Sequence, residues 1–241
     1  MTTKSYTPRA ISALGSSAVL WLAINVAADA VAIVSAGMEV VMLSSLPGQT
    51  RLDEWGGFPD SSGMSMWTGL ARIPIFLAFL ITAVIVLKWM YRANRNAHAF
   101  GRGLVSTPPG AVYWYFVPIG NLWKPFQAMN ETWRVSHDPE GWKRTFVPDL
   151  MRWWWGFWLI GTILGNASGR IGWRADDTGA LQLATTLEVL SAVMMIGAGL
   201  SLIRIVRAIS SQQTSLIEQG WSRPERPAPQ AWSGVGADEP F

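Results

Sequence analysis

The sequence predicts an all-α, polytopic membrane protein with four transmembrane helices. Half of the 241 residues are apolar, only 15% are charged, and four long apolar segments alternate with polar connections. An average soluble domain carries roughly 25% charged residues. No internal repeat or change of composition divides the chain, so we expect one four-helix transmembrane domain over residues 1–219. Residues 220–241 are rich in Pro, Arg, Ala and Gly and predict a disordered cytoplasmic tail.

The first apolar segment, residues 11–46, predicts an uncleaved transmembrane helix. A signal peptide has an apolar core of roughly 7–15 residues followed by a small-residue cleavage site. Here the apolar character continues well past that length. Residues 30–32, Ala-Val-Ala, form the best cleavage-like site, and a cleaved leader is the alternative.

Three further helices are expected over residues 66–90, 150–167 and 180–210. The uncharged part of the helix over residues 66–90 is shorter than the roughly 20 residues that a span needs. Arg72 and Lys88 at its ends can extend their cationic groups to the two interfaces, which restores the length. We expect Pro74 in the first turns of this helix, where a missing N–H costs little.

Two further patterns concern where the helices end and how closely they pack. Tryptophans near the segment ends are typical of interfacial belts; the candidates are Trp21, Trp67, Trp89, Trp153, Trp154 and Trp173.

Gly161 with Gly165, and Gly197 with Ser201, permit close helix approach. We expect these approaches within one bundle rather than between copies.

The distribution of the 19 lysines and arginines predicts how the chain threads. With four spans, 15 of them fall on one side: at the N-terminus, between residues 88 and 152, and at the C-terminal end. The other side holds Arg51, Arg72, Arg170 and Arg174. Cytoplasmic loops carry an excess of cations. We therefore expect both termini in the cytoplasm.

The stretch of residues 88–136 is the expected functional surface. It begins with a cationic, amide-rich helix pattern, breaks at the glycines and prolines of residues 101–109, and continues through the uncharged aromatic run 111–123. Pro118 interrupts this run and Lys124 closes it early. We expect a re-entrant or interfacial segment between the second and third helices rather than a fifth span.

An ordered run of aromatic, amide and charged residues extends from the second expected helix to the third. It comprises Trp89, Tyr91, Arg92, Ala93, Asn96, Ala97, Trp114, Phe116, Pro118, Asn121, Leu122, Pro125, Met129, Glu131, Trp133, Trp153, Trp154 and Trp155. This run resembles a bacterial membrane family known only as a domain of unknown function, over about residues 68–207. The resemblance implies a four-helix, multi-pass protein of the bacterial inner membrane and supplies no activity.

Seven polar residues of this stretch could converge beneath the bundle as a binding surface. They are Arg92, Arg95, Asn96, Asn121, Lys124, Glu131 and Arg134. Guanidinium and amide groups suit phosphate and carboxylate, so an anionic lipid headgroup, a small ligand or a protein partner would fit. The alternative is ordinary cytoplasmic positive charge, together with an Arg–Glu pair that fixes the fold of the segment.

Asp29, near the middle of the first helix, is a second candidate site, with Asn25 one turn earlier on the same face. An ionisable group at that depth is costly and is a functional hypothesis by default. It could relay protons or ions, or pair with Arg72 or Glu188. The alternative is a protonated or hydrogen-bonded carboxyl that holds helices together. Glu39 and Glu188 are expected at the outer interface.

The residue types argue against most enzymatic chemistry. The chain has no cysteine and two histidines, His98 and His137, both in expected loops. Disulfides, thiolate sites and bis-histidine haem are therefore not expected. The sequence holds no His cluster, phosphate loop or G-x-S-x-G elbow, so we expect no catalytic, cofactor or metal site. In a membrane context, aromatic residues among cations indicate interface anchoring rather than nucleic acid binding.

These patterns favour a non-enzymatic accessory or assembly subunit, or a binding scaffold, for a membrane-protein complex or an anionic lipid. The alternative is a small-solute or ion transporter or channel. In that case Asp29 would face a polar path and the break between Pro118 and Pro125 would form a gate. Both hypotheses place the chain in the bilayer, with a membrane-protein partner or a second copy of itself.

Overall fold

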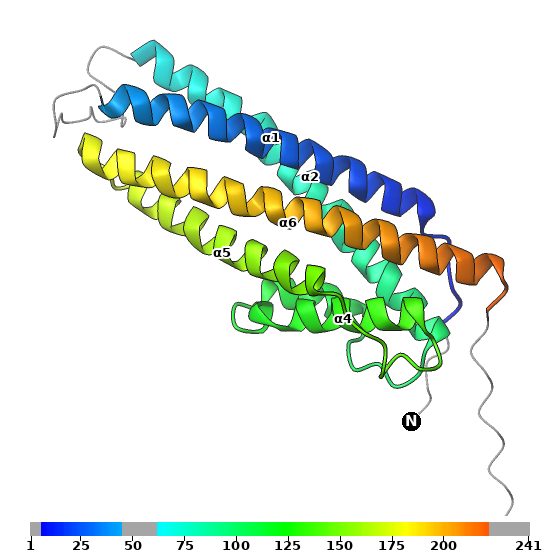
Figure 1. Cartoon of the computed structure of the whole chain (residues 1–241). Coiled ribbons are helices and arrows are strands. Elements are labelled where there is room, and N and C mark those ends of the chain that lie inside the picture. Colours follow the sequence, from blue (N-terminus) through cyan, green and yellow to red (C-terminus); the bar gives the residue numbers. More distant parts are fainter. Residues whose placement is uncertain (1–5, 45–61, 222–241) are drawn as a thin grey trace, which may run out of the picture.

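A computed structural model of the chain describes residues 6–44 and 62–221, and it is all-helical. Its elements in order are α1 (Ser12–Ser44), α2 (Ser62–Phe100), α3 (Pro108–Tyr113), the short 3₁₀ turns η1 (Trp114–Phe116) and η2 (Gly120–Leu122), α4 (Lys124–His137), α5 (Asp149–Gly172) and α6 (Thr178–Glu218). The four long helices lie side by side (Figure 1). This arrangement confirms the expected all-α class.

Three helices of the described ranges are long and apolar enough to cross a membrane. They are α1 over Ser12–Met38, α2 over Ile73–Phe100, and α6 over Thr178–Glu218. The fourth long helix, α5, lies along α6 but is not among the three. Its apolar face is built largely from tryptophan, which adds little to mean hydropathy. The protein is therefore a multi-pass membrane protein by the length and composition of its helices.

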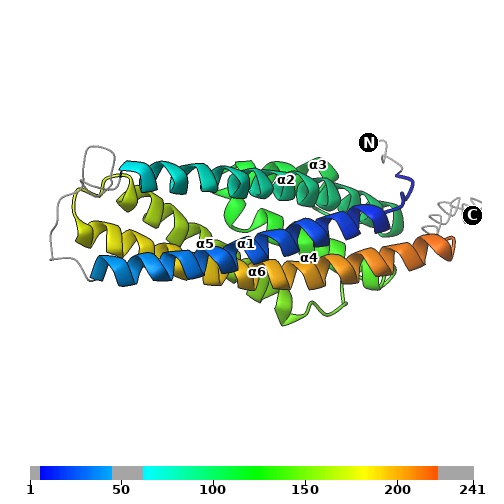
Figure 2. The ribbon, with the colours of Figure 1, turned by 90° about the horizontal axis from the view of Figure 1, so that it is seen from above.

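The chain segments rich in cations lie together at one end of the bundle, here called the cationic end. Residues 6–11, the last turns of α2 and α6, and α4 all lie there (Figures 1 and 2). The opposite end, here called the outer end, holds the end of α1 and the beginnings of α2 and α6. The sequence predicted that the residues before the first helix, the central stretch and the end of the last helix lie on one side.

α6 is the central helix, and it contacts α1, α2, α4 and α5. Glycines allow α5 and α6 to approach each other closely. A Cβ on Gly161 of α5 would lie 3.0 Å from the sulfur of Met195, and one on Gly197 of α6 would lie 2.9 Å from the ring of Phe157. Ser191 adds a hydrogen bond from its Oγ to the Gly161 carbonyl, at 2.9 Å. The glycine pattern therefore serves packing within this bundle.

The apolar core lies toward the cationic end, and it includes two of the tryptophans expected at interfaces. Trp89 and Trp154 are buried, so their assignment to an interfacial belt is wrong. Trp89 is satisfied inside the protein because its indole N–H donates to Ser210 Oγ at 2.9 Å. Trp153 and Trp173 are exposed, as an interfacial position requires.

Two helices extend further than their apolar segments. α2 begins at Ser62 and ends at Phe100, so Pro74 lies in its interior and not in its first turns. α6 continues to Glu218 and ends through a left-handed Gly220 (φ 66°), the conformation that glycine adopts most readily. The side chains of Glu39, Trp67 and Arg72, and the tail from residue 222, lie outside the described residues.

Candidate binding surface

A buried polar cluster joins the helices at the cationic end, and Gln213 of α6 lies at its centre. Its Oε1 accepts from Asn96 Nδ2 at 3.1 Å, and its Nε2 donates to the Ala93 carbonyl at 2.9 Å and to Ser136 Oγ at 3.0 Å. Gln213 and Asn96 are both 0% exposed. We call these residues, with Arg9, the polar hub. It connects α2, α4 and α6.

The polar hub also holds the N-terminal segment against α2. Asn96 accepts from the Arg9 backbone N–H at 2.9 Å and donates to the Arg9 carbonyl at 2.8 Å. One turn earlier, Arg92 Nη1 donates to the Ala10 carbonyl at 2.9 Å. Arg95 stacks over the ring of Tyr6, with 5.8 Å from the guanidinium carbon to the ring centroid. Three of the seven predicted surface residues thus fix the segment that precedes α1.

Glu131 of α4 fixes the connection between α2 and α3. It is nearly buried, and its Oε2 accepts from the Ser106 backbone N–H at 2.9 Å. The Ser106 carbonyl lies 2.8 Å from His98 Nε2. The Glu131 carboxylate therefore accepts a hydrogen bond from a backbone amide of the connection between α2 and α3.

Asn121 and Lys124 lie at the turn into α4, beside tryptophans of α5 and η1. The Lys124 ammonium lies 5.8 Å from the ring centroid of Trp114, within cation–π range. Leu122, which lies between Asn121 and Lys124 in the sequence, accepts a hydrogen bond at its carbonyl from the indole N–H of Trp155 at 2.9 Å. This turn is therefore anchored to the first turns of α5.

The seven predicted residues do not form one small-ligand site. Arg92, Arg95 and Asn96 face the N-terminal segment, and Glu131 faces Ser106. Lys124 and Arg134 are ten residues apart on α4, which is about 15 Å at a rise of 1.5 Å per residue. Buried polar atoms without a hydrogen-bond partner are likewise scattered among the described residues: Asn94 Oδ1, Arg95 Nε, Asn121 Oδ1, Asn130 Oδ1, Arg134 Nε and Trp221 Nε1.

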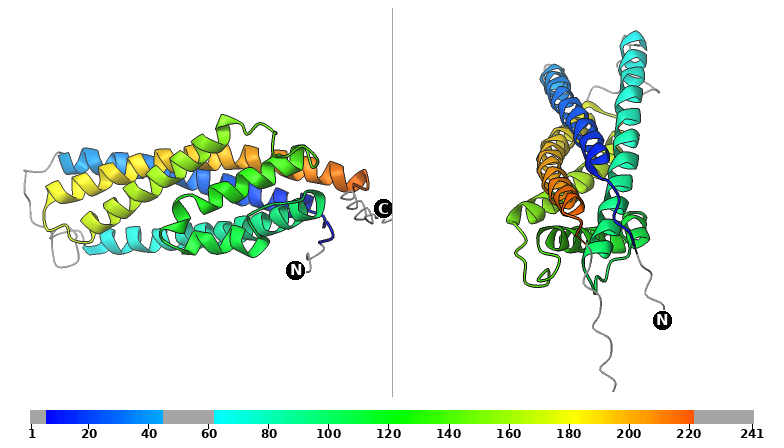
Figure 3. Two further views of the ribbon diagram at one scale, coloured as in Figure 1. Left: turned by 90° about the horizontal axis from the view of Figure 1, so that it is seen from below. Right: turned by 90° about the vertical axis from the view of Figure 1, so that its right-hand side faces the viewer.

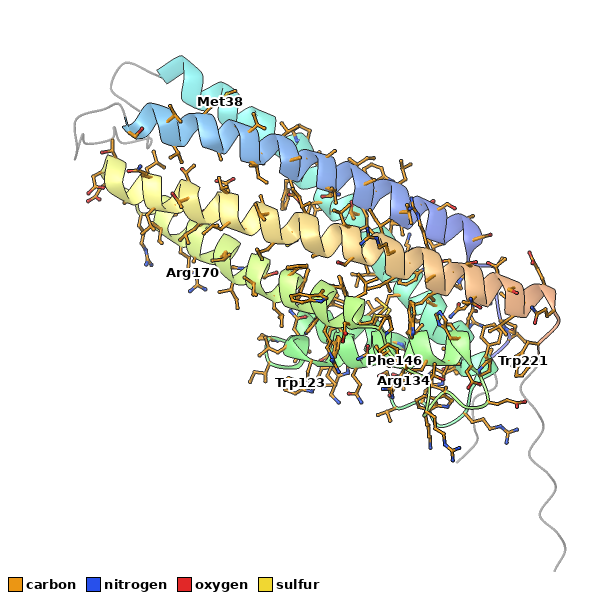
Figure 4. All side chains as sticks on the ribbon, viewed as in Figure 1. Met38, Trp123, Arg134, Phe146, Arg170 and Trp221 are labelled. Carbon is orange, nitrogen blue, oxygen red and sulfur yellow. The ribbon has the colours of Figure 1, made fainter. Side chains whose placement is uncertain are left out.

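A row of exposed apolar side chains runs along the segment from α3 to η2. It comprises Tyr113, Phe116, Ile119, Leu122 and Trp123, and we call it the aromatic ridge. Phe116 and Ile119 are each 70% exposed. Trp123 lies at the edge of the bundle, on the side away from α1 (Figure 4). The opposite side of the segment packs on α5, where the rings of Tyr115 and Trp158 lie 6.2 Å apart.

The second candidate site lies where α1 crosses α2. Asn25 Nδ2 donates to Thr82 Oγ1 of α2 and to the Trp21 carbonyl at 3.0 Å. Asn25 therefore holds two helices together. Asp29, one turn further toward the outer end, is half-buried, and no hydrogen bond or ion pair reaches its carboxyl from the described residues. The structure does not pair it with Glu188.

Sequence reasoning named Asn96 but missed its hub partners Gln213 and Ser136, and it also missed Thr82. Gln213 could have been found because it is an amide on the helix face that also carries the apolar residues Val206 and Ile209. A buried amide needs partners. The described residues include no group of three or more His, Asp or Glu that could hold a metal ion.

A family model described as a domain of unknown function, DUF4328, matches residues 61–211. The match extends from the beginning of α2 to the cationic end of α6 and includes the polar residues of the central stretch. α1, with Asn25 and Asp29, precedes it. No curated protein and no solved structure matches the chain.

Proposed function

The chain belongs to the DUF4328 family, whose description names no activity, and we propose from the geometry that it is a non-enzymatic, four-span assembly or accessory subunit. Its binding surface would be the outer halves of α1 and α2, which would receive a transmembrane helix of a partner protein. The observation that carries the proposal is the carboxyl of Asp29, which has no partner among the described residues and lies beside a helix half that nothing else in the described structure covers.

α5 is proposed as the fourth span. Its 24 residues extend about 36 Å, enough for a hydrocarbon core of about 30 Å. Arg152 and Arg170 lie near its two ends, where each guanidinium can reach an interface. Four spans return the C-terminal end of α6 to the side of the N-terminus, and the excess of cations there favours the cytoplasm for both.

The aromatic ridge is proposed to lie in the membrane interface rather than to span. The segment packs on Trp155 and Trp158, and Trp158 lies six residues beyond Arg152, about 9 Å deeper along α5. Apolar faces of interfacial segments enter the headgroup and acyl boundary by about 5–10 Å. An uncharged, exposed ridge at this depth fits lipid contact on the cytoplasmic side.

The outer half of α2 has the features of an uncovered helix. Every side chain of residues 73–81 except Ala78 is exposed. Beyond the contact at Thr82, the outer ends of α1 and α2 lie apart from each other (Figure 3). Lipid could cover the apolar groups without cost, but it cannot satisfy Asp29, which lies one turn beyond Asn25 toward the same end.

A carboxyl within a membrane is normally paired with another polar or charged group. A basic side chain on a partner's transmembrane helix would supply the missing group, and the exposed apolar face of α2 would supply the packing surface. The same unpaired carboxyl favours the second candidate function, transport of a proton or small cation past Asp29. The two differ in whether a second protein is required.

Purification in a gentle detergent from the native membrane, followed by mass spectrometry, tests the proposal. We expect a stoichiometric membrane-protein partner with the unmodified chain and with Asp176→Asn, an exposed acidic residue of the outer loop. The Asp29→Asn variant should lose that partner while remaining monodisperse. A partner retained by Asp29→Asn would contradict the proposed contact. A chain that purifies alone and carries an Asp29-dependent flux would establish the transport function instead.

A further inference from the structure

A groove of about 780 Å³ lies between α1 and α6 at the cationic end. Its lining changes from apolar to polar along its length. Residues that line it include Ala23, Leu20, Ser16 and Ser12 from α1, and Arg207 and Ser211 from α6. We propose that this groove binds one phospholipid molecule, with its phosphate held by Arg207, Ser16 and Ser211 and its acyl chains directed toward Leu20 and Ala23.

The two helices run in opposite directions, and their contacts fix which residues share a level. Gly15 lies against Ser210, and Gly199 lies against Val26. By this register, Arg207 is level with about residue 18 of α1, and Ser211 with about residue 14. Ala23 and Leu20 lie deeper in the bundle than Arg207, while Ser16 and Ser12 lie toward the cytoplasmic side. The groove is therefore apolar on the membrane side and hydroxyl-lined beyond it.

The level of Arg207 matches that of a lipid headgroup. Arg204 and Arg207 are the first charged residues after the apolar part of α6, which contains Glu188 as its one charge between residues 180 and 203. α6 continues for eleven residues past Arg207, about 16 Å, before it ends at Glu218. The groove thus crosses from the hydrocarbon edge into the headgroup region, where a lipid changes from apolar to polar in the same direction.

The polar groups of the groove are available to a ligand. Arg207 is exposed, and no carboxylate of the described residues lies within ion-pair distance of it. Glu218 also lines the groove, but it lies about 16 Å further along α6. Ser12, Ser16 and Ser211 are exposed and make no side-chain hydrogen bond within the described residues. One guanidinium with several hydroxyl donors suits one phosphate diester.

This site differs from the proposed partner surface in place and in chemistry. Asn25 contacts Thr82 of α2, and Asp29 lies one turn beyond it on α1, whereas the groove lies between α1 and α6. A volume near 780 Å³ falls within the range of small-molecule sites, roughly 300–1,000 Å³. It can hold a headgroup, the glycerol and the first part of two acyl chains, with the rest of the chains in the surrounding bilayer.

The test is native mass spectrometry of the full chain after reconstitution into nanodiscs that contain phosphatidylglycerol. We expect one retained phosphatidylglycerol per protein. Arg207→Gln should reduce its retention roughly tenfold, because a charge-assisted hydrogen bond is worth at least about 1.4 kcal/mol. Arg204→Gln, an exposed arginine that does not line the groove, is the matched control and should behave as the unmodified chain does.

Two further arms complete the test. Ser211→Leu fills the groove without changing its charge and should also lower the retention of phosphatidylglycerol. This variant tests the proposal if Arg207→Gln does not yield folded protein. Glycerol phosphate at millimolar concentration should not displace the lipid, since it lacks acyl chains. Unchanged retention in the groove variants, equal loss with Arg204→Gln, or displacement by glycerol phosphate would overturn the proposal.

Discussion

Asn96 of α2 donates a hydrogen bond of 3.1 Å to Gln213 of α6, and neither side chain is exposed. This bond joins two helices that otherwise have few contacts with each other. Each amide has several partners, so the burial cost of the polar groups is offset. The polar hub therefore fixes the positions of α2, α4 and α6 relative to one another at the cationic end.

Replacement of Gln213 by leucine should destabilise the protein by about 1–3 kcal/mol, because Asn96 and Ser136 would each lose a buried partner. The measurement is the melting temperature of purified protein in detergent. Gln212→Leu changes the same residue type at an exposed neighbouring position and should leave the melting temperature nearly unchanged. Equal effects of the two substitutions would show that the polar hub does not contribute to stability.

Gly15→Ala should lower the melting temperature, whereas Gly37→Ala should not. A Cβ at Gly15 would clash with Ser210 Oγ and would push α1 away from the hydroxyl that accepts from Trp89. Overpacking of this kind costs about 1–3 kcal/mol. Gly37 lies on the same helix with nothing within 4 Å of its Cβ position. A methyl there should be neutral or slightly stabilising, since alanine favours the helix by up to about 1 kcal/mol.

The helical class and the grouping of chain segments at the two ends followed from hydropathy and charge, because these properties are averages over many residues. Helix ends did not follow from them. α2 continues ten residues past the expected end at residue 90, and α6 eight past residue 210. Hydropathy falls at the ends of the apolar segments, but the backbone stays helical beyond them because Asn96 and Gln213 are buried in tertiary contacts there.

The sequence could not show which of the seven polar residues lie together, because proximity in sequence does not fix which way a side chain points. Arg92, Arg95 and Asn96 were placed with Lys124 and Arg134 because all are polar and lie in one stretch. The structure directs the first three toward residues 6–10, which precede the first helix. That contact joins residues more than eighty positions apart, and no local pattern reports it.

The aromatic ridge should contact lipid. The chain has no cysteine, so Phe116→Cys can be labelled at a single site with an environment-sensitive fluorophore after reconstitution in liposomes. Because Phe116 is 70% exposed on an uncharged segment, we expect emission typical of an apolar environment and quenching by lipid-borne bromine. Arg144→Cys, exposed in the polar connection before α5, should respond to aqueous iodide instead. Strong iodide quenching at position 116 would place the ridge in water.

The same cysteine-free background allows the fourth span to be tested directly. If α5 crosses the membrane, the connections on its two sides lie in different compartments. Arg174→Cys, exposed after α5, should then react with a membrane-impermeant maleimide in intact cells, and Arg144→Cys should react only after permeabilisation. If α5 lies along the surface instead, both positions share one side and must label together. The same experiment also tests the direction of threading. The cations near residue 144 outnumber those near residue 174, so residue 144 is expected on the cytoplasmic side. Labelling of residue 144 alone in intact cells would reverse the proposed orientation while keeping the fourth span.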